Sequence, residues 1–121
     1  MGRDIFVQDL PPGIESIADI ADDFAPGAIG HRAHFIAAIK EIAPHADFSD
    51  PSWGVIAKQN SYHIEVNFGR DEDLESFAFH VAGGAEADAL IAKILKTLGL
   101  RALDTASESG LFELPTPNHA P

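Results

Sequence analysis

Two histidines and a glutamate fall where alternating chain segments could gather them into one chemical site. His63 and Glu65 occupy alternate positions within residues 61–68, and His80 lies within residues 75–82. Because side chains alternate across a strand, His63 and Glu65 project from the same face of the first segment. Imidazoles titrate near neutral pH and ligate metals, and a carboxylate complements both roles. These three residues are therefore the first candidates for a functional site.

The apolar residues of the same two segments restrict how the segments pair. They are Tyr62, Ile64, Val66 and Phe68 in the first segment and Phe77, Phe79 and Val81 in the second. A short polar stretch, residues 69–74, joins the segments and predicts an antiparallel pair. Only registers with Phe77 opposite Val66 or Phe68 keep both apolar sets on one face. His80 then faces either Glu65 or His63, and both registers place the three candidates together on the polar face.

Trp53 and Asn67 complete the set of candidate binding residues. Asn67 follows Glu65 on the polar side of its strand, and Trp53, the only tryptophan, opens a third predicted strand at residues 53–58. The indole could anchor the core with its N–H satisfied, or it could belong to a binding surface, and we favour the core. The full candidate set is His63, Glu65, Asn67, His80 and Trp53.

Two amphipathic helices are predicted at residues 30–43 and 85–98. Pro44 ends the first, and Gly99 is well placed to cap the second. Their apolar stripes need a surface to cover, and the apolar side of the predicted strands offers one. We therefore expect an α+β fold in which both helices pack on one face of an antiparallel sheet. The sheet is built on a three-strand meander, about residues 53–58, 61–68 and 75–82.

The remaining segments are expected to complete a single domain over residues 1–114. Residues 4–7 suggest an edge strand, and residues 14–24 fit either a short amphipathic helix or an extended arm. Further strands are expected at 100–104 and 110–114, followed by a flexible C-terminal tail at 115–121. The tail carries three prolines and lacks apolar periodicity.

The composition restricts the class of partner. Nineteen acidic residues against 8 basic ones give a formal net charge of −11, which repels nucleic acid and anionic lipid. The chain has no cysteine, so any metal would be held by His, Asp or Glu. No apolar run approaches the length of a membrane span or of a signal-peptide core, and we expect a cytoplasmic protein.

Three phrases of the chain resemble those of small bacterial proteins of unassigned function. They are ADFSDPSWG at 46–54, SFAFHVAGG at 76–84 and LGLRALD at 98–104. In size, acidity and layout the chain is also similar to small α+β immunity proteins that neutralise bacterial toxins. This resemblance implies a protein partner and transfers no catalytic residue.

Two hypotheses about function follow, and we expect the protein not to be an enzyme. In the first, a protein-binding module without a cofactor uses its polar sheet face to engage another protein or its own copy. In the second, His63, Glu65 and His80 bind zinc or iron, as in a small metal-binding protein or a metal-dependent hydrolase. Acid–base chemistry by Glu65 and His80 without a metal would require a pocket that desolvates one of them.

Overall fold

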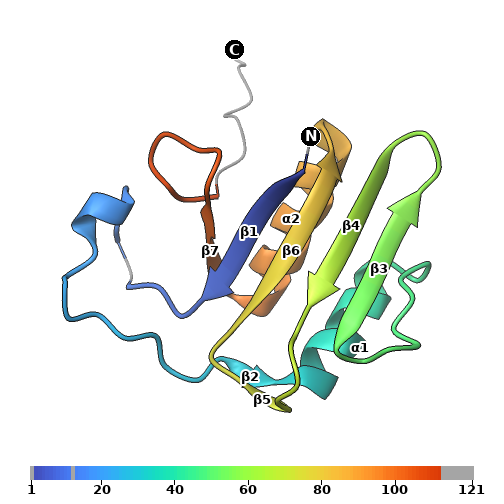
Figure 1. The fold of residues 1–121 in the computed structure, drawn as a ribbon, viewed down its shortest axis with the longest axis horizontal. Coiled ribbons are helices and arrows are strands. Elements are labelled where there is room, and N and C mark those ends of the chain that lie inside the picture. The colour runs from blue at the N-terminus through green and yellow to red at the C-terminus, as the bar shows by residue number, and fades with distance from the viewer. Residues whose placement is uncertain (1, 12, 113–121) are drawn as a thin grey trace.

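The protein has an α+β fold, as predicted, in which two helices cover one face of an antiparallel sheet (Figure 1). The computed structural model describes residues 2–11 and 13–112. Within them the strand order is β3-β4-β6-β1-β7. The strands are β1 (Arg3–Gln8), β3 (Trp53–Lys58), β4 (Tyr62–Asn67), β6 (Ser76–Gly83) and β7 (Arg101–Asp104), and the helices are α1 (Arg32–Ile42) and α2 (Ala85–Leu98).

The pairing of β4 with β6 follows one of the two predicted registers. Val66 lies opposite Phe79, and Glu65 lies opposite His80. The apolar side chains of both strands face the helices and are buried, in full agreement with the predicted alternation. They are Tyr62, Ile64, Val66, Phe68, Phe77, Phe79 and Val81. Among the described residues, no helix lies on the opposite face of the sheet (Figure 1).

Two details of the sheet differ from expectation. The connection between β4 and β6 is more than a turn, because it contains β5 (Asp73–Leu74), which pairs with β2 (Gly30–His31) in a separate small sheet. The simple three-strand meander is therefore interrupted. In addition, β1 is not an edge strand, because it lies between β6 and β7 and pairs antiparallel with both.

The helix boundaries reflect local signals and one tertiary contact. Helix α2 spans the predicted residues, and Gly99 adopts the left-handed conformation, with φ 68°, that a glycine cap accommodates. Helix α1 begins at Arg32, two residues after the predicted start, because Gly30 and His31 instead pair with β5. The Arg32 N–H donates to the Glu72 carbonyl at 2.7 Å, and this bond joins the start of α1 to the connection between β4 and β6.

The segment at 14–24 is an extended arm that contains one short 3-10 turn, η1 (Ile17–Asp19). The Ile17 N–H donates to the Ser109 carbonyl at 2.8 Å, so the arm is tied to the loop that follows β7. A small second core of Leu10, Ile14 and Leu111 lies beneath it. Of the predicted strand at 110–114, Leu111 forms a bridge with Leu103, whereas residues 113–114 and the predicted tail at 115–121 lie outside the described residues.

Serine side chains organise the loop that precedes β3. The Ser49 hydroxyl and N–H both donate to Asp47, and these bonds lower the pKa of the Asp47 carboxyl. Ser52 binds Asp50 in the same way and lowers its pKa too. A carboxyl whose pKa is depressed by folding stabilises the fold above its unfolded pKa. This contribution is lost as the pH falls through the folded pKa, so the loop should loosen in acid.

Replacing Gly54 with alanine should destabilise the protein, because the Phe48 ring occupies the space that a side chain would need. A Cβ at residue 54 would lie 2.2 Å from Phe48 Cε1. We expect a loss of about 2 kcal/mol in the free energy of unfolding, as is typical for overpacking. Urea denaturation measures it. Combining Gly54→Ala with Phe48→Ala removes the clash, so the double variant should lose less than the sum of the two single losses. Strict additivity would contradict this account.

Candidate functional site

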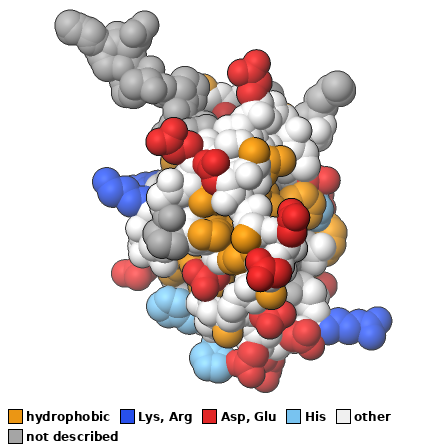
Figure 2. Space-filling model, turned by 90° about the vertical axis from the view of Figure 1, so that its left-hand side faces the viewer, with side chains coloured by type: hydrophobic (Ala, Val, Ile, Leu, Met, Phe, Trp, Pro, Cys, Tyr) orange, Lys and Arg blue, Asp and Glu red, His pale blue; other side chains and the backbone are white. Residues whose placement is uncertain are grey.

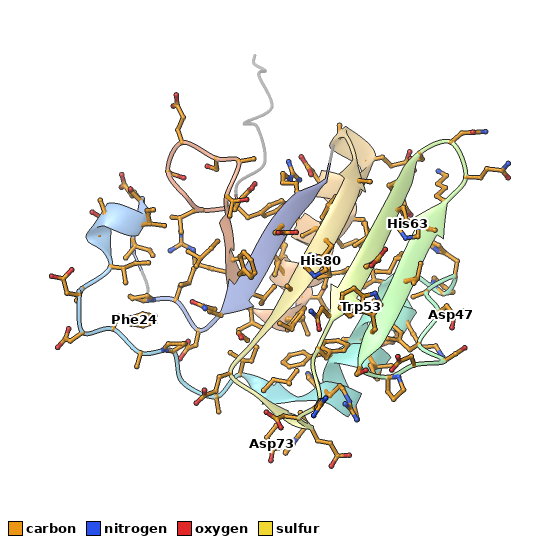
Figure 3. The ribbon with its side chains drawn as sticks, viewed as in Figure 1. Phe24, Asp47, Trp53, His63, Asp73 and His80 are labelled. Carbon is orange, nitrogen blue, oxygen red and sulfur yellow. The ribbon has the colours of Figure 1, made fainter. Side chains whose placement is uncertain are left out.

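The candidate site lies on the open face of the sheet, opposite the helices. Trp53, His63 and His80 come from the adjacent strands β3, β4 and β6 and lie near one another (Figure 3). Cross-strand pairing places Glu65 opposite His80 and His80 opposite Asp4. The structure therefore brings His63, Glu65 and His80 onto one face, as predicted from their alternation.

Glu65 is the centre of a hydrogen-bond network. The indole N–H of Trp53 donates to Glu65 Oε1 at 2.9 Å, and His63 Nε2 lies 3.1 Å from Glu65 Oε2. Each carboxylate oxygen thus has one partner. A carboxylate with neighbours on both sides orients them, and here it fixes the plane of the indole ring. The network links β3 to β4 across the open face.

His80 extends this network to β1. Its ring stacks on the Trp53 indole, with centroids 5.4 Å apart and an interplanar angle of 19°. His80 Nδ1 lies 2.7 Å from Asp4 Oδ1. An ionised carboxylate can only accept, so this contact is a hydrogen bond when the imidazole carries a proton on Nδ1. Carboxylates at both ends thus hold Trp53 and His80 in place.

A shallow hollow of about 190 Å³ lies beside these side chains. Its lining residues are Gly2, Arg3, Asp4, His63, Glu65, His80, Val81 and Ala82. His63 is 53% exposed and His80 is 33% exposed at the side chain, so neither imidazole is sealed from solvent. The surface can meet a partner, and it offers little desolvation for acid–base chemistry by Glu65 and His80.

Trp53 and Asn67 differ from the other candidate residues in where their side chains lie. The preferred core position of Trp53 is wrong: the side chain is 40% exposed on the open face, because Gly54 and Ile56 take the inward positions of β3. Asn67 lies on the open face, but its side-chain oxygen accepts a hydrogen bond from the Gly69 N–H at 3.0 Å. Its carbonyl thus shapes the turn after β4 and does not join the Glu65 network.

Sequence reasoning missed Asp4. The residue is 76 positions away from its partner His80. Alternation places Asp4 on the side of its strand opposite the apolar Ile5 and Val7, and this pattern could have predicted that Asp4 lies on the face away from the core. Nothing local indicates that this strand pairs with β6, since β-sheet neighbours are chosen by long-range packing.

The arrangement of the side chains does not directly support the metal hypothesis. Within residues 2–11 and 13–112, no three His, Asp or Glu side chains are arranged to hold a metal ion. Glu65 and His80 are cross-strand neighbours. The Glu65 carboxylate, however, contacts Trp53 and His63, and the His80 ring contacts Asp4. Zinc or iron binding by His63, Glu65 and His80 would require these contacts to rearrange.

The fold and site together define a small α+β protein with a polar-aromatic sheet face that no helix of the described residues covers. No family model, curated protein or solved structure matches the chain. In the described part of the chain, neither helix has the length and apolar character that crossing a bilayer requires. Function therefore has to be inferred from the geometry of the face.

Proposed function

We propose that this protein is a non-catalytic protein-binding module whose contact surface is the open face of the sheet. The observation that carries the proposal is an exposed tryptophan held in one orientation. Trp53 is clamped by its bond to Glu65 and by its stack on His80, although it lies on the protein surface. Tryptophan is enriched among the residues that dominate the energetics of protein interfaces.

Fixing an aromatic side chain before binding favours a tight complex. A free indole would lose rotamer entropy on contact with a partner, a cost of about 0.5–1.5 kcal/mol for an ordered side chain. Here the Glu65 carboxylate and the His80 ring have already imposed that order. Surrounding polar groups, such as Nε2 of His80, can supply the hydrogen bonds of an interface rim.

The charge of the chain favours a basic partner. At −11 the protein attracts cationic surfaces and speeds encounter with them. Inhibition of a basic toxin, in the manner of an immunity protein, is one form of this function. Pairing of the open face with a second copy is another, and it would bring like charges together.

Replacing Trp53 with alanine should abolish most binding through this face. We expect affinity for a captured partner to fall by at least about tenfold, as for a central aromatic anchor. Wild type and variant should be compared by quantitative pull-down from native lysate, with crosslinking to map contacts. Lys93→Ala, on the exposed side of α2, is the matched control and should retain wild-type capture.

Light scattering of the purified protein separates the two forms of the proposal. A homodimer that Trp53→Ala converts to a monomer would identify the partner as a second copy. A monomer whose retained proteins are the same for wild type, Trp53→Ala and His80→Ala would refute binding through the open face. Circular dichroism should confirm that each variant is folded.

Metal binding by His63, Glu65 and His80 is the alternative function. It is favoured by one observation: the Asp4 carboxylate holds Nδ1 of His80, which is how outer carboxylates orient metal-ligating histidines. Elemental analysis of protein purified without a histidine tag tests it. Stoichiometric zinc or iron that is lost in His80→Ala would favour the metal site. Sub-stoichiometric metal in the wild type would exclude it.

A further inference from the structure

A second hollow, of about 450 Å³, lies at the other edge of the open face, between β1, β7 and the arm. Phe6, Ile17 and Leu103 supply its apolar walls, and Glu108 and Gly110 also line it. Phe6 is 36% exposed and Ile17 is 51% exposed, and these are two of the three large apolar side chains exposed in the described part of the chain. Trp53, the third, is in the site already described.

Backbone contacts fix the walls of this hollow. The Ile17 N–H donates to the Ser109 carbonyl at 2.8 Å, and Ile17 lies so close to Gly110 that a Cβ there would be 2.5 Å from Ile17 Cγ2. The Ser16 and Asp19 side chains form a capping box around the 3-10 turn. These contacts hold Ile17 at the surface from both sides. The hollow is therefore already present in the free protein.

The segments around the hollow hold most of the net charge of the protein. Residues 4–31 contain six carboxylates and residues 102–112 contain two, a total of eight, with no lysine or arginine in either segment. The rest of the chain has 11 carboxylates, which is 19 minus these eight, against 8 basic residues. The side of the molecule that carries the arm shows apolar side chains at its middle with acidic side chains around them (Figure 2).

We infer that this hollow receives a cationic, amphipathic polypeptide segment of the partner: one aliphatic or aromatic side chain enters between Phe6, Ile17 and Leu103, and flanking lysines or arginines meet the surrounding carboxylates. The inference rests on the proposed function, because it names the chemistry of the partner that the open face binds. An apolar anchor supplies affinity, and complementary charge supplies the encounter rate and the choice of partner.

Charge argues for this occupant over a second copy of the chain. Two copies meeting at the hollow would bring together the exposed Glu108 carboxylates and the arms at 14–24, each of which carries four exposed carboxylates and no lysine or arginine. Like charges opposed across an interface are strongly unfavourable. Nucleic acid and anionic membranes are disfavoured for the same reason.

Selection from a random-sequence peptide display library tests the inference with the full-length protein as bait. The selected peptides should carry lysine or arginine on both sides of one large apolar residue. Their affinity should fall by about tenfold or more in Ile17→Ser and in Phe6→Ser, since each change removes an apolar contact of the anchor. Both side chains are partly exposed in the free protein, so the variants should fold.

Matched variants distinguish the contribution of charge to binding from that of the apolar anchor. They also distinguish failure of this inference from failure of the proposed function. Glu108→Gln should weaken binding and flatten its salt dependence, whereas Glu41→Gln on α1 should do neither. Peptides without basic enrichment, or a dimer that forms through the hollow, would overturn the inference. If the selected peptides lose affinity in Trp53→Ala but not in Ile17→Ser, the inference fails and the proposed function stands. If no peptide responds to either variant, both fail.

Discussion

Replacing Phe79 with alanine should lower the free energy of unfolding by about 4 kcal/mol, the typical cost of removing a buried aromatic ring. Phe79 is 0% exposed and lies in β6, between Ile5 on one neighbouring strand and Val66 on the other. Its ring also contacts Phe77 edge-on at 5.4 Å. Because domains of this kind are stable by only about 5–15 kcal/mol, this loss should leave the variant partly unfolded at modest temperature. Urea denaturation followed by circular dichroism measures it.

A matched control uses the other face of the neighbouring strand. Phe6 in β1 projects from the open face, where 36% of it is already exposed. Phe6→Ala should therefore cost much less than Phe79→Ala, because less area leaves an apolar environment. Equal losses for the two variants would show that the sheet is buried on both faces, and the open-face assignment would be wrong.

Replacing Arg3 with alanine should cost about 3 kcal/mol, because the change leaves a buried carboxylate without its cation. Arg3 forms an ion pair with Asp88 of α2, and its Nε lies 4.0 Å from Asp104 Oδ1. Asp104 is 6% exposed and is the only buried charged residue in the described part of the chain. The guanidinium thus joins α2 and β7 through β1. Chemical denaturation at neutral pH measures the loss.

Replacing Asp104 with a neutral residue should restore part of the stability that Arg3→Ala loses. In Arg3→Ala/Asp104→Asn the buried group no longer carries a charge, so the double variant should be more stable than Arg3→Ala alone. A double variant less stable than Arg3→Ala would show that Asp104 matters through other contacts, such as its bond to the Ala106 N–H. Lys58→Ala, which breaks the exposed pair with Glu86, should leave unfolding nearly unchanged.

Period-two alternation was sufficient to assign the faces of the central strands. The apolar sets of β4 and β6 had to share a side, and this requirement alone put His63, Glu65 and His80 on the other side. It left two registers open, however. The structure has the register that sets Glu65 opposite His80, and alternation cannot distinguish it from the other register because a slip of two residues keeps every side chain on its face.

Trp53 shows where residue type misleads. A lone tryptophan usually suggests a core anchor, but its position on β3 is decided by its neighbours. Gly54 lies against the Phe48 ring, and Ile56 is 0% exposed, so these two residues occupy the inward side and turn Trp53 outward. The bonds from Glu65 and the stack on His80 then give the exposed indole a fixed orientation.

The sequence by itself determined the elements whose signals are local: both helices, the alternation of the central strands, the glycine cap after α2 and the excess of acid. Only the tertiary structure decided what depends on contacts between distant residues. Such contacts insert β1 between β6 and β7, bring Asp4 to His80, and carry the arm to the loop after β7, where the second hollow forms. The physical reason is that helix and strand patterns depend on residues close together in the sequence. The order of strands in a sheet instead depends on the free energy of the whole folded chain.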